Sequence, residues 1–294
     1  MILVLAGPTA SGKSRVAMNL ARRFDAVIVN GDAFQVYQEL SIATAKPSRE
    51  EQAGIPHYLY DFVPLTEAYS VYEYQKDLRQ ILAQMHEKQK NVIIAGGTGL
   101  YLRAGLYDYE FPEEKPVDLS VYEAMGEEER YAFLRSIDPE SAASIHPHNR
   151  IRVLNAIKIY LVTGKRKSEL LAEQEHKPIY EDVVFFGLNP ERSALFEKTD
   201  ERVETMFEMG IEEENRRLVE KYGRDARAFR AIGVKEFFPY WDGEATLDEV
   251  KETIKSNTRH YAKRQWTFFR NQFDIHWVSG EEEILEELEH GKHL

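Results

Sequence analysis

The sequence predicts an α/β fold built on a parallel sheet, and three apolar runs carry that prediction. They occupy residues 2–6, 26–29 and 91–95, and small or polar residues follow each of them before a helical stretch begins. Continuous apolar runs of this kind are typical of parallel strands that are buried on both faces. Because ligands bind such sheets at the carboxyl ends of the strands, the residues after each run are expected along one edge.

The first run leads into GPTASGKS at residues 7–14, which matches a phosphate-binding loop, or P-loop, before a helix expected over residues 13–23. Gly7 and Gly12 allow the backbone to close around an anion, and the helix N-terminus adds roughly half a positive charge. Lys13 is expected at the terminal phosphates and Ser14 at a magnesium ion. The predicted core is therefore P-loop NTPase-like, with these diphosphate-binding residues: Gly7, Pro8, Thr9, Ala10, Ser11, Gly12, Lys13 and Ser14.

The other two runs place a carboxylate and a hydroxyl at the same edge. Asp32 ends the phrase NGD after the second run, and Thr98 ends the phrase GGT after the third. A carboxylate that faces a P-loop serves either as a proton acceptor or as a magnesium ligand, and the sequence leaves both interpretations open. On sequence alone, Thr98 is typical of a helix N-cap.

The middle of the chain has a different residue pattern. Residues 111–178 show helical periodicity interrupted by four prolines, at positions 112, 116, 139 and 147. A fourth apolar run at 183–188 is expected to rejoin the sheet, and a last short strand is expected near 276–278. The predicted domains are a catalytic P-loop core of residues 1–112 and 178–294, and a helical insertion domain of residues 113–177.

Composition limits the classes of protein to consider. A chain of 294 residues with 43% hydrophobic residues is long enough for two folded domains. The lack of cysteine excludes disulfides, thiolate nucleophiles and cysteine-ligated zinc. No apolar run approaches the roughly eighteen residues of a membrane span. The first residues already belong to a core strand. A soluble cytoplasmic monomer with no membrane partner is therefore expected.

Charge is unevenly distributed along the chain, whose formal net charge is −12. Residues 141–168 contain no acidic residue but several basic ones, including Arg150 and Arg152, and residues 255–270 form a second basic stretch. The acidic runs at 127–129 and 212–214 are typical of solvated helix faces. This segregation is compatible with a basic groove for nucleic acid, and also with basic faces that pair with acidic ones.

Four further phrases extend the P-loop into a longer pattern. They are GDAFQVYQELSIATAKP at 31–47, IPHYLYD at 55–61, AGGTGLYLRA at 95–104 and YAKRQWTFFRN at 261–271. In this order they resemble the tRNA dimethylallyltransferases, and the resemblance covers nearly the whole chain. It implies transfer of a dimethylallyl group from dimethylallyl diphosphate to the exocyclic amine of the adenosine 3′-adjacent to the anticodon in tRNA, with release of diphosphate.

The resemblance also implies roles for residues at matching positions. Asp32 is the implied general base, Thr98 hydrogen-bonds at the reacting centre, and Arg230 is a further contact to the diphosphate. Mg2+ is the implied cofactor, and the implied partners are dimethylallyl diphosphate and the anticodon stem-loop of tRNA. The implied tRNA-binding residues are Asp32, Ala33, Phe34, Gln35, Thr98, Ile151, Arg152, Val153, Leu154 and Asn155.

The chemistry of a P-loop suits this reaction. The loop grips two adjacent phosphates whether the atom attacked is phosphorus or the carbon bonded to the diphosphate. When diphosphate is the leaving group, Lys13, the loop amides and magnesium would stabilise its growing negative charge.

Some positions depart from the family pattern, and most of them fall on the tRNA side. Asn155 and Lys158 stand where an arginine and a glutamate are usual, and Ala43 stands where glycine is usual. Other functions therefore stay open: prenyl transfer to a free adenine nucleotide, a small-molecule P-loop kinase, and RNA binding without catalysis.

Overall fold

The computed structural model describes residues 1–111, 117–174 and 177–290, and the chain divides into two compact units. Unit 1 comprises Met1–Leu106 and Tyr180–Leu294, and unit 2 comprises Tyr107–Ile179. The predicted insertion, residues 113–177, lies within unit 2.

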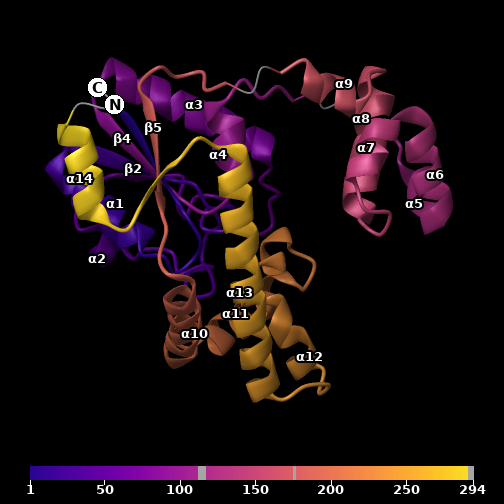
Figure 1. The fold of residues 1–294 in the computed structure, drawn as a ribbon. Helices are drawn as coiled ribbons and strands as arrows, with labels where there is room; N and C mark the ends of the chain where they lie inside the picture. The colour runs from indigo at the N-terminus through magenta and orange to yellow at the C-terminus, as the bar shows by residue number, and fades with distance from the viewer. Residues whose placement is uncertain (112–116, 175–176, 291–294) are drawn as a thin grey trace. The chain divides into compact units, whose positions relative to one another are not determined.

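Unit 1 contains one six-stranded parallel sheet with the order β3-β2-β4-β1-β5-β6. Strands β2, β4 and β5 of this sheet are labelled in Figure 1. This sheet confirms the predicted α/β fold, and β5 rejoins it beside β1 as expected. The short strand β3, which pairs with β2, has no clear signal in the sequence. The strands are β1 (Ile2–Ala6), β2 (Ala26–Asn30), β3 (His57–Tyr58), β4 (Asn91–Ala95), β5 (Val183–Leu188) and β6 (His276–Val278).

In the sequence, the helices of unit 1 fall into those that precede β5 or follow β6 and those that lie between these two strands. The first group is α1 (Lys13–Arg23), α2 (Arg49–Gln52), α3 (Val71–Glu87), α4 (Gly99–Leu106) and α14 (Glu281–Glu289). The second group is α10 (Arg192–Glu208), α11 (Ile211–Tyr222), α12 (Phe238–Trp241) and α13 (Leu247–Gln272), with 3-10 turns η1 (Arg227–Arg230) and η2 (Lys235–Phe237). Capping boxes start the long helices α3 and α13, since Ser70 and Thr246 each pair with a glutamate three residues later.

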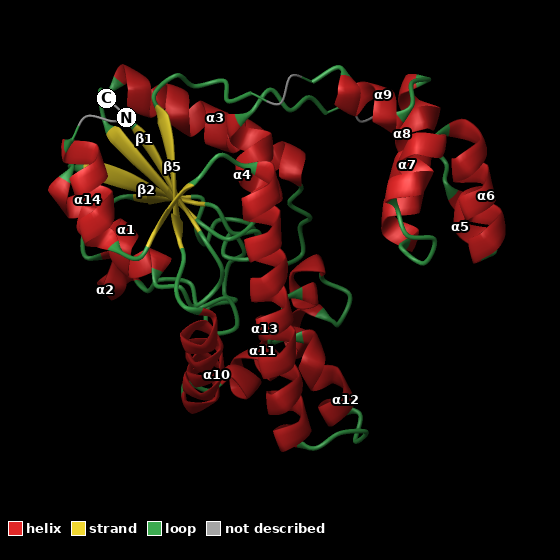
Figure 2. Cartoon of the chain, in the orientation of Figure 1, coloured by secondary structure: helices red, strands yellow, loops and turns green. Residues whose placement is uncertain are grey.

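The core of unit 1 is built on both faces of the sheet. Leu3 and Leu5 of β1 and Ile93 of β4 pack in one cluster with Leu20 of α1 and Ile284 of α14. The strands lie between α1 and α14 on one side and α3 and α4 on the other (Figure 2). Since strand residues alternate between faces, this arrangement explains why the strands read as continuous apolar runs.

Two glycines let β2 and β4 end side by side. The N–H of Gly31 donates to the Ala95 carbonyl at 2.9 Å. A Cβ atom on Gly96 would lie 2.1 Å from the Gly31 carbonyl carbon, so only glycine fits there. This close approach brings the residues after the two strands together at the edge where β1 ends in the P-loop.

Unit 2 is helical and has its own small core. Its helices are α5 (Ser120–Ala124), α6 (Glu127–Ile137), α7 (Pro139–Ser144), α8 (Arg150–Thr163) and α9 (Lys167–Ala172). Leu134, Val153 and Ile157 are buried in this core. The buried carboxylate of Asp138 caps α7 and accepts the Ser168 hydroxyl at 2.7 Å, which ties α9 to the rest of the unit.

The acidic run at 212–214 differs from the expected solvated face. Glu212 accepts a hydrogen bond from Trp241 Nε1 at 2.8 Å, and Glu214 is half-buried, while Glu213 is exposed. The reason is that successive residues of α11 point in directions about 100° apart, so a run of like residues cannot share one environment. Among the described residues, no helix combines the length and apolarity needed to cross a membrane.

Candidate active site

The P-loop connects β1 to α1 and closes around its own lysine. Lys13 Nζ donates to the carbonyl oxygens of Gly7 at 2.9 Å and Pro8 at 2.7 Å. Gly12 takes φ of 88° immediately before α1, in the left-handed region that favours glycine. The hydroxyl of Ser11 is buried and has no hydrogen-bond partner in the described part of the chain. The loop thus holds a cation and an unused polar group where an anionic ligand would bind.

The electrostatics of the loop favour such an anion. Burial, together with the positive charge of Arg202, lowers the pKa of Lys13 to about 7, and the carboxylate of Asp32 acts in the opposite direction. Burial also lowers the pKa of Arg202, again opposed by Asp32. Two desolvated cations beside one carboxylate leave this site short of negative charge.

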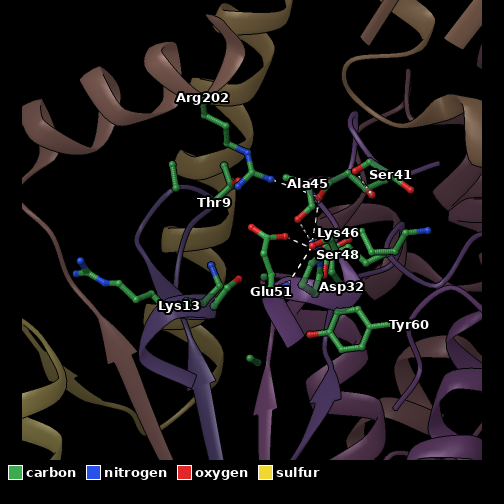
Figure 3. Close-up of a pocket in the computed structure, with 18 of the residues that line it drawn as sticks. Thr9, Lys13, Asp32, Ser41, Ala45, Lys46, Ser48, Glu51, Tyr60 and Arg202 are labelled. Atoms are coloured by element: carbon green, nitrogen blue, oxygen red, sulfur yellow. Dashed lines mark hydrogen bonds between the residues drawn. The ribbon is translucent and has the colours of Figure 1, made fainter. Parts of the chain in front are cut away.

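These charged groups line a cavity of about 990 Å3, which we call the larger cavity. Its walls include Lys13 and Ser14 of the P-loop, Asp32 and Tyr60. Arg202 reaches into it from α10, toward Thr9 and Ala45 (Figure 3). Sequence analysis missed Arg202, because an arginine inside a helix outside any motif gives no local signal.

The carboxylate of Asp32 is held in place by the end of β2. The side chain of Asn30, which is fully buried, accepts the Asp32 N–H at 2.8 Å and donates to the Asp32 carbonyl at 2.8 Å. Asp32 Oδ1 accepts the N–H of Phe34 at 2.9 Å. Burial and the charge of Asp32 raise the pKa of the Tyr60 hydroxyl, so Tyr60 stays protonated as a donor beside the carboxylate. Asn30 was also missed, although a polar residue ending an apolar run is a usable signal.

Thr98 joins the glycine-rich turn to the Asp32 segment. Its hydroxyl oxygen accepts the N–H of Ala33 at 3.0 Å, and its own N–H donates to the Gly31 carbonyl at 3.0 Å. Its carbonyl accepts from Tyr101 in the first turn of α4, as an N-cap residue's does. Thr98 does not line the larger cavity or the smaller one described next.

A smaller cavity, of about 240 Å3, adjoins the larger one. The two share the following residues as walls: Thr9, Asp32, Thr44, Arg202 and Met206. Apolar side chains, including Phe34, Ala43 and Ile232, line much of the smaller cavity. Arg230, predicted at the diphosphate, is exposed and lines the smaller cavity but not the larger one, into which the P-loop opens.

Gln265 of α13 fastens the P-loop to the turn after β4. Its Oε1 accepts the N–H of Thr9 at 2.8 Å, and its Nε2 donates to the carbonyl of Gly97 at 2.8 Å. Its neighbour Arg264 lines the smaller cavity, and Lys263 is exposed. The phrase AKRQ therefore contributes its glutamine to the architecture of the site.

The model of a family described as IPP transferase matches residues 35–272. That range covers most of the chain and every residue that lines the two cavities except those of the P-loop, Arg15, Asp32 and Phe34. The chain belongs to the IPP transferase family.

Relatives of this IPP transferase agree with that assignment. The chain is 44% identical to the tRNA dimethylallyltransferase of Anoxybacillus flavithermus over 278 residues, which span 94% of this chain and 89% of the relative. It is 39% identical to the tRNA dimethylallyltransferase of Bacillus subtilis over 282 residues, covering 94% and 90% of the two chains.

Solved structures of similar proteins share the fold. A tRNA isopentenylpyrophosphate transferase from Staphylococcus epidermidis superposes with a TM-score of 0.73 at 35% identity, covering 98% of this chain and 97% of that one. A eukaryotic dimethylallyltransferase acting on tRNA superposes with a TM-score of 0.83 at 30% identity, covering 94% and 73%. The tRNA isopentenyltransferase structures have a P-loop NTPase-like core, as predicted for this IPP transferase from its sequence.

In unit 2 of this IPP transferase, the predicted RNA-binding stretch lies in the first turns of α8. Ile151, Arg152 and Asn155 are exposed, and Leu154 is half-buried. The structure corrects the prediction that Val153 binds RNA through its side chain. Its side chain is only 1% exposed and packs in the core of unit 2, because residues of one helix stretch cannot all share a face.

Proposed function

We infer that this IPP transferase transfers the dimethylallyl group of dimethylallyl diphosphate to the exocyclic amine of the adenosine 3′-adjacent to the anticodon in tRNA. One observation carries the inference: Lys13, Arg202 and Asp32 line a single cavity. Two cations favour binding of a diphosphate, and a carboxylate can accept the proton that an amine loses. Relatives named tRNA dimethylallyltransferase support the substrates.

In this proposal, the P-loop and Arg202 bind the diphosphate. The loop amides and Lys13 hold one side of the group, and the guanidinium of Arg202 faces it from α10. As the bond between the allylic carbon and oxygen breaks, its electron pair moves onto the diphosphate. Preorganised donors and cations stabilise that growing charge more than they stabilise the bound substrate, which accelerates the step. Arg230 would contact the ligand from the smaller cavity.

Asp32 then serves as the base. The amine nitrogen attacks the allylic carbon, the carbon–oxygen bond breaks, and the nitrogen carries a surplus proton. The hydrogen bond from Phe34 to Oδ1 fixes the carboxylate and leaves Oδ2 to accept that proton. Since an aryl amine becomes acidic only as the new bond forms, this transfer comes late in the step.

Magnesium would bind through the P-loop in this proposal. The described residues contain no cluster of three or more His, Asp or Glu suited to a metal. Mg2+ at a phosphate site needs only one or two protein oxygens together with the substrate's phosphates and water. Ser14 is exposed and lines the larger cavity, so its hydroxyl is the protein ligand that we assign. The ion would neutralise charge on the diphosphate.

The RNA side of the proposal involves both units. The target base must leave its stack to reach Asp32, at a cost of a few kcal/mol. The segment from Asp32 through Gln35 would receive it, and exposed Ile151, Arg152 and Asn155 would contact the anticodon stem-loop. Gln35 Nε2 donates to the carbonyls of Thr44 and Ala45, so its amide also braces this wall. We propose a cytoplasmic monomer, as expected from the sequence.

Labelled dimethylallyl diphosphate, Mg2+ and unmodified tRNA test the proposal. After incubation and nuclease digestion, we expect label in the adenosine 3′-adjacent to the anticodon. Lys13→Ala and Asp32→Asn should each abolish most transfer. Asp274→Asn removes an exposed carboxylate that lines neither cavity and should leave transfer intact. Label in AMP but not in tRNA would show that the acceptor is a free nucleotide. Consumption of ATP without prenyl transfer would show that the protein is a kinase or an ATPase.

A further inference from the structure

Residues 41–45, which we call the 41–45 loop, form part of the wall of both cavities. Ser41, Ile42 and Ala45 line the larger cavity, Ala43 lines the smaller one, and Thr44 lines both. The loop is a tight turn, in which the N–H of Ala45 donates to the Ile42 carbonyl at 3.0 Å. Its position therefore sets the shape of the site on one side.

The backbone is strained two residues before this loop and at its last residue. Glu39 takes φ of 62° and Ala45 takes φ of 45°, in the left-handed region that residues other than glycine avoid. Such conformations persist only when the surrounding structure holds them. Something outside the loop must therefore keep it in place.

Glu214 of α11 provides that support. Its carboxylate accepts the N–H groups of three successive residues: Ser41 at 3.2 Å, Ile42 at 2.9 Å and Ala43 at 3.4 Å. Successive backbone N–H groups form a concave site that binds an anion. Burial raises the pKa of Glu214, and the loop's N–H groups oppose that change. The same helix also holds Glu39, through Lys221 and Tyr222.

The loop in turn orients Arg202. The carbonyl of Thr44 accepts Arg202 Nη2 at 3.4 Å and Gln35 Nε2 at 3.0 Å. The Thr44 hydroxyl donates to the Leu40 carbonyl at 2.7 Å, so this residue moves with the loop. A connected set of contacts thus runs from Glu214 through the loop to the guanidinium in the larger cavity.

The next residue of α11 braces the facing segment. Asn215, which is fully buried, donates to the Gly233 carbonyl at 2.6 Å. Gly233 lies against Ala43, since a Cβ atom on the glycine would be 3.6 Å from the Ala43 Cβ. Adjacent residues of one helix therefore hold two segments that line the smaller cavity.

We propose that Glu214 is a positioning residue for the prenyl diphosphate, acting through the 41–45 loop on Arg202 and on the shape of the two cavities. This proposal rests on the proposed function, because it assumes that the cavity binds a diphosphate. Glu214 itself does not line either cavity and touches no substrate. Its effect should therefore fall on binding of the prenyl donor.

Glu214→Gln tests the proposal, with Glu213→Gln as its matched control. The glutamine has the same shape, but its NH2 group cannot accept a backbone N–H. We expect KM for dimethylallyl diphosphate and Kd for inorganic pyrophosphate, measured by calorimetry, to rise about tenfold. We expect KM for tRNA to stay within about twofold, because the stem-loop contacts that we assign lie in unit 2, although Gln35 hydrogen-bonds to this loop. Glu213 is exposed on the same helix, and its variant should match the unmodified protein in every constant.

Each outcome decides one question. A Glu214→Gln protein with normal KM and Kd, or one that loses only kcat and thermal stability, would overturn the positioning role. If this variant does not fold, Glu214→Asp, which keeps the charge but shortens the reach, should show the same rise in KM. An unmodified protein that neither binds pyrophosphate nor transfers the prenyl group would overturn the proposed function, and this proposal with it.

Discussion

Raising the pH from 7 to 8 should weaken pyrophosphate binding about fivefold, because Lys13 loses its proton over this range in the free protein. Burial and Arg202 lower the pKa of Lys13 to about 7. Roughly half of the molecules then carry the charge at pH 7, and about one in eleven at pH 8. A bound diphosphate stabilises the ammonium and raises its pKa, so binding takes up a proton above pH 7. About one pH unit lower, near pH 6, most of the lysine is already charged, and this contribution to the pH dependence disappears.

Calorimetry in two buffers of different ionisation enthalpy measures the effect directly. At pH 8 the expected uptake is about 0.9 proton for each pyrophosphate bound, falling to about half a proton at pH 7. Lys13→Arg provides the control, because a guanidinium keeps its charge throughout this range. That variant should show only the pH dependence that comes from the ionisation of pyrophosphate itself, even if its geometry makes binding weaker. Equal affinity of the unmodified protein at pH 7 and 8, without proton uptake, would refute the reasoning.

Three further changes test other parts of the structure. Asn30→Ala removes the side chain that holds Asp32, so kcat should fall about tenfold. The KM for the prenyl donor should stay nearly unchanged, and an unchanged kcat in steady-state kinetics would contradict this role of Asn30. Gly96→Ala places a methyl group against the backbone after β2 and should lower the free energy of unfolding by about 2 kcal/mol or more in a urea titration. Arg152→Ala should weaken tRNA binding and reduce its salt slope by about one, whereas exposed Arg135→Ala should not.

The sheet could be predicted because its determinants are local in the sequence. The runs that form β1, β2 and β4 are apolar without interruption, and the P-loop marks the junction of β1 and α1. Strand β3 has only two residues and forms by pairing with β2, so no residue pattern predicts it. Fold class therefore followed from the sequence more completely than the list of strands did.

The candidate site was less predictable, because much of it depends on contacts between distant residues. The P-loop and Asp32 belong to motifs, and the structure places them around one cavity. Arg202 and Glu214 lie in helices far along the chain, and only the packing of α10 and α11 brings them to the 41–45 loop. Glu214 was also hidden in an acidic run, where composition suggests solvent exposure although the helix turns this residue inward.

The chain enters and leaves unit 2 through two adjacent segments. Tyr107 pairs with Pro178, and the N–H of Asp108 donates to the Lys177 carbonyl at 3.1 Å. Because the two ends of unit 2 lie side by side, a short turn could replace the whole unit and reconnect the core. We therefore expect a change in the length of unit 2 to leave the sheet of unit 1 intact. A chimaera carrying the corresponding segment of a relative would show whether the choice of RNA travels with it.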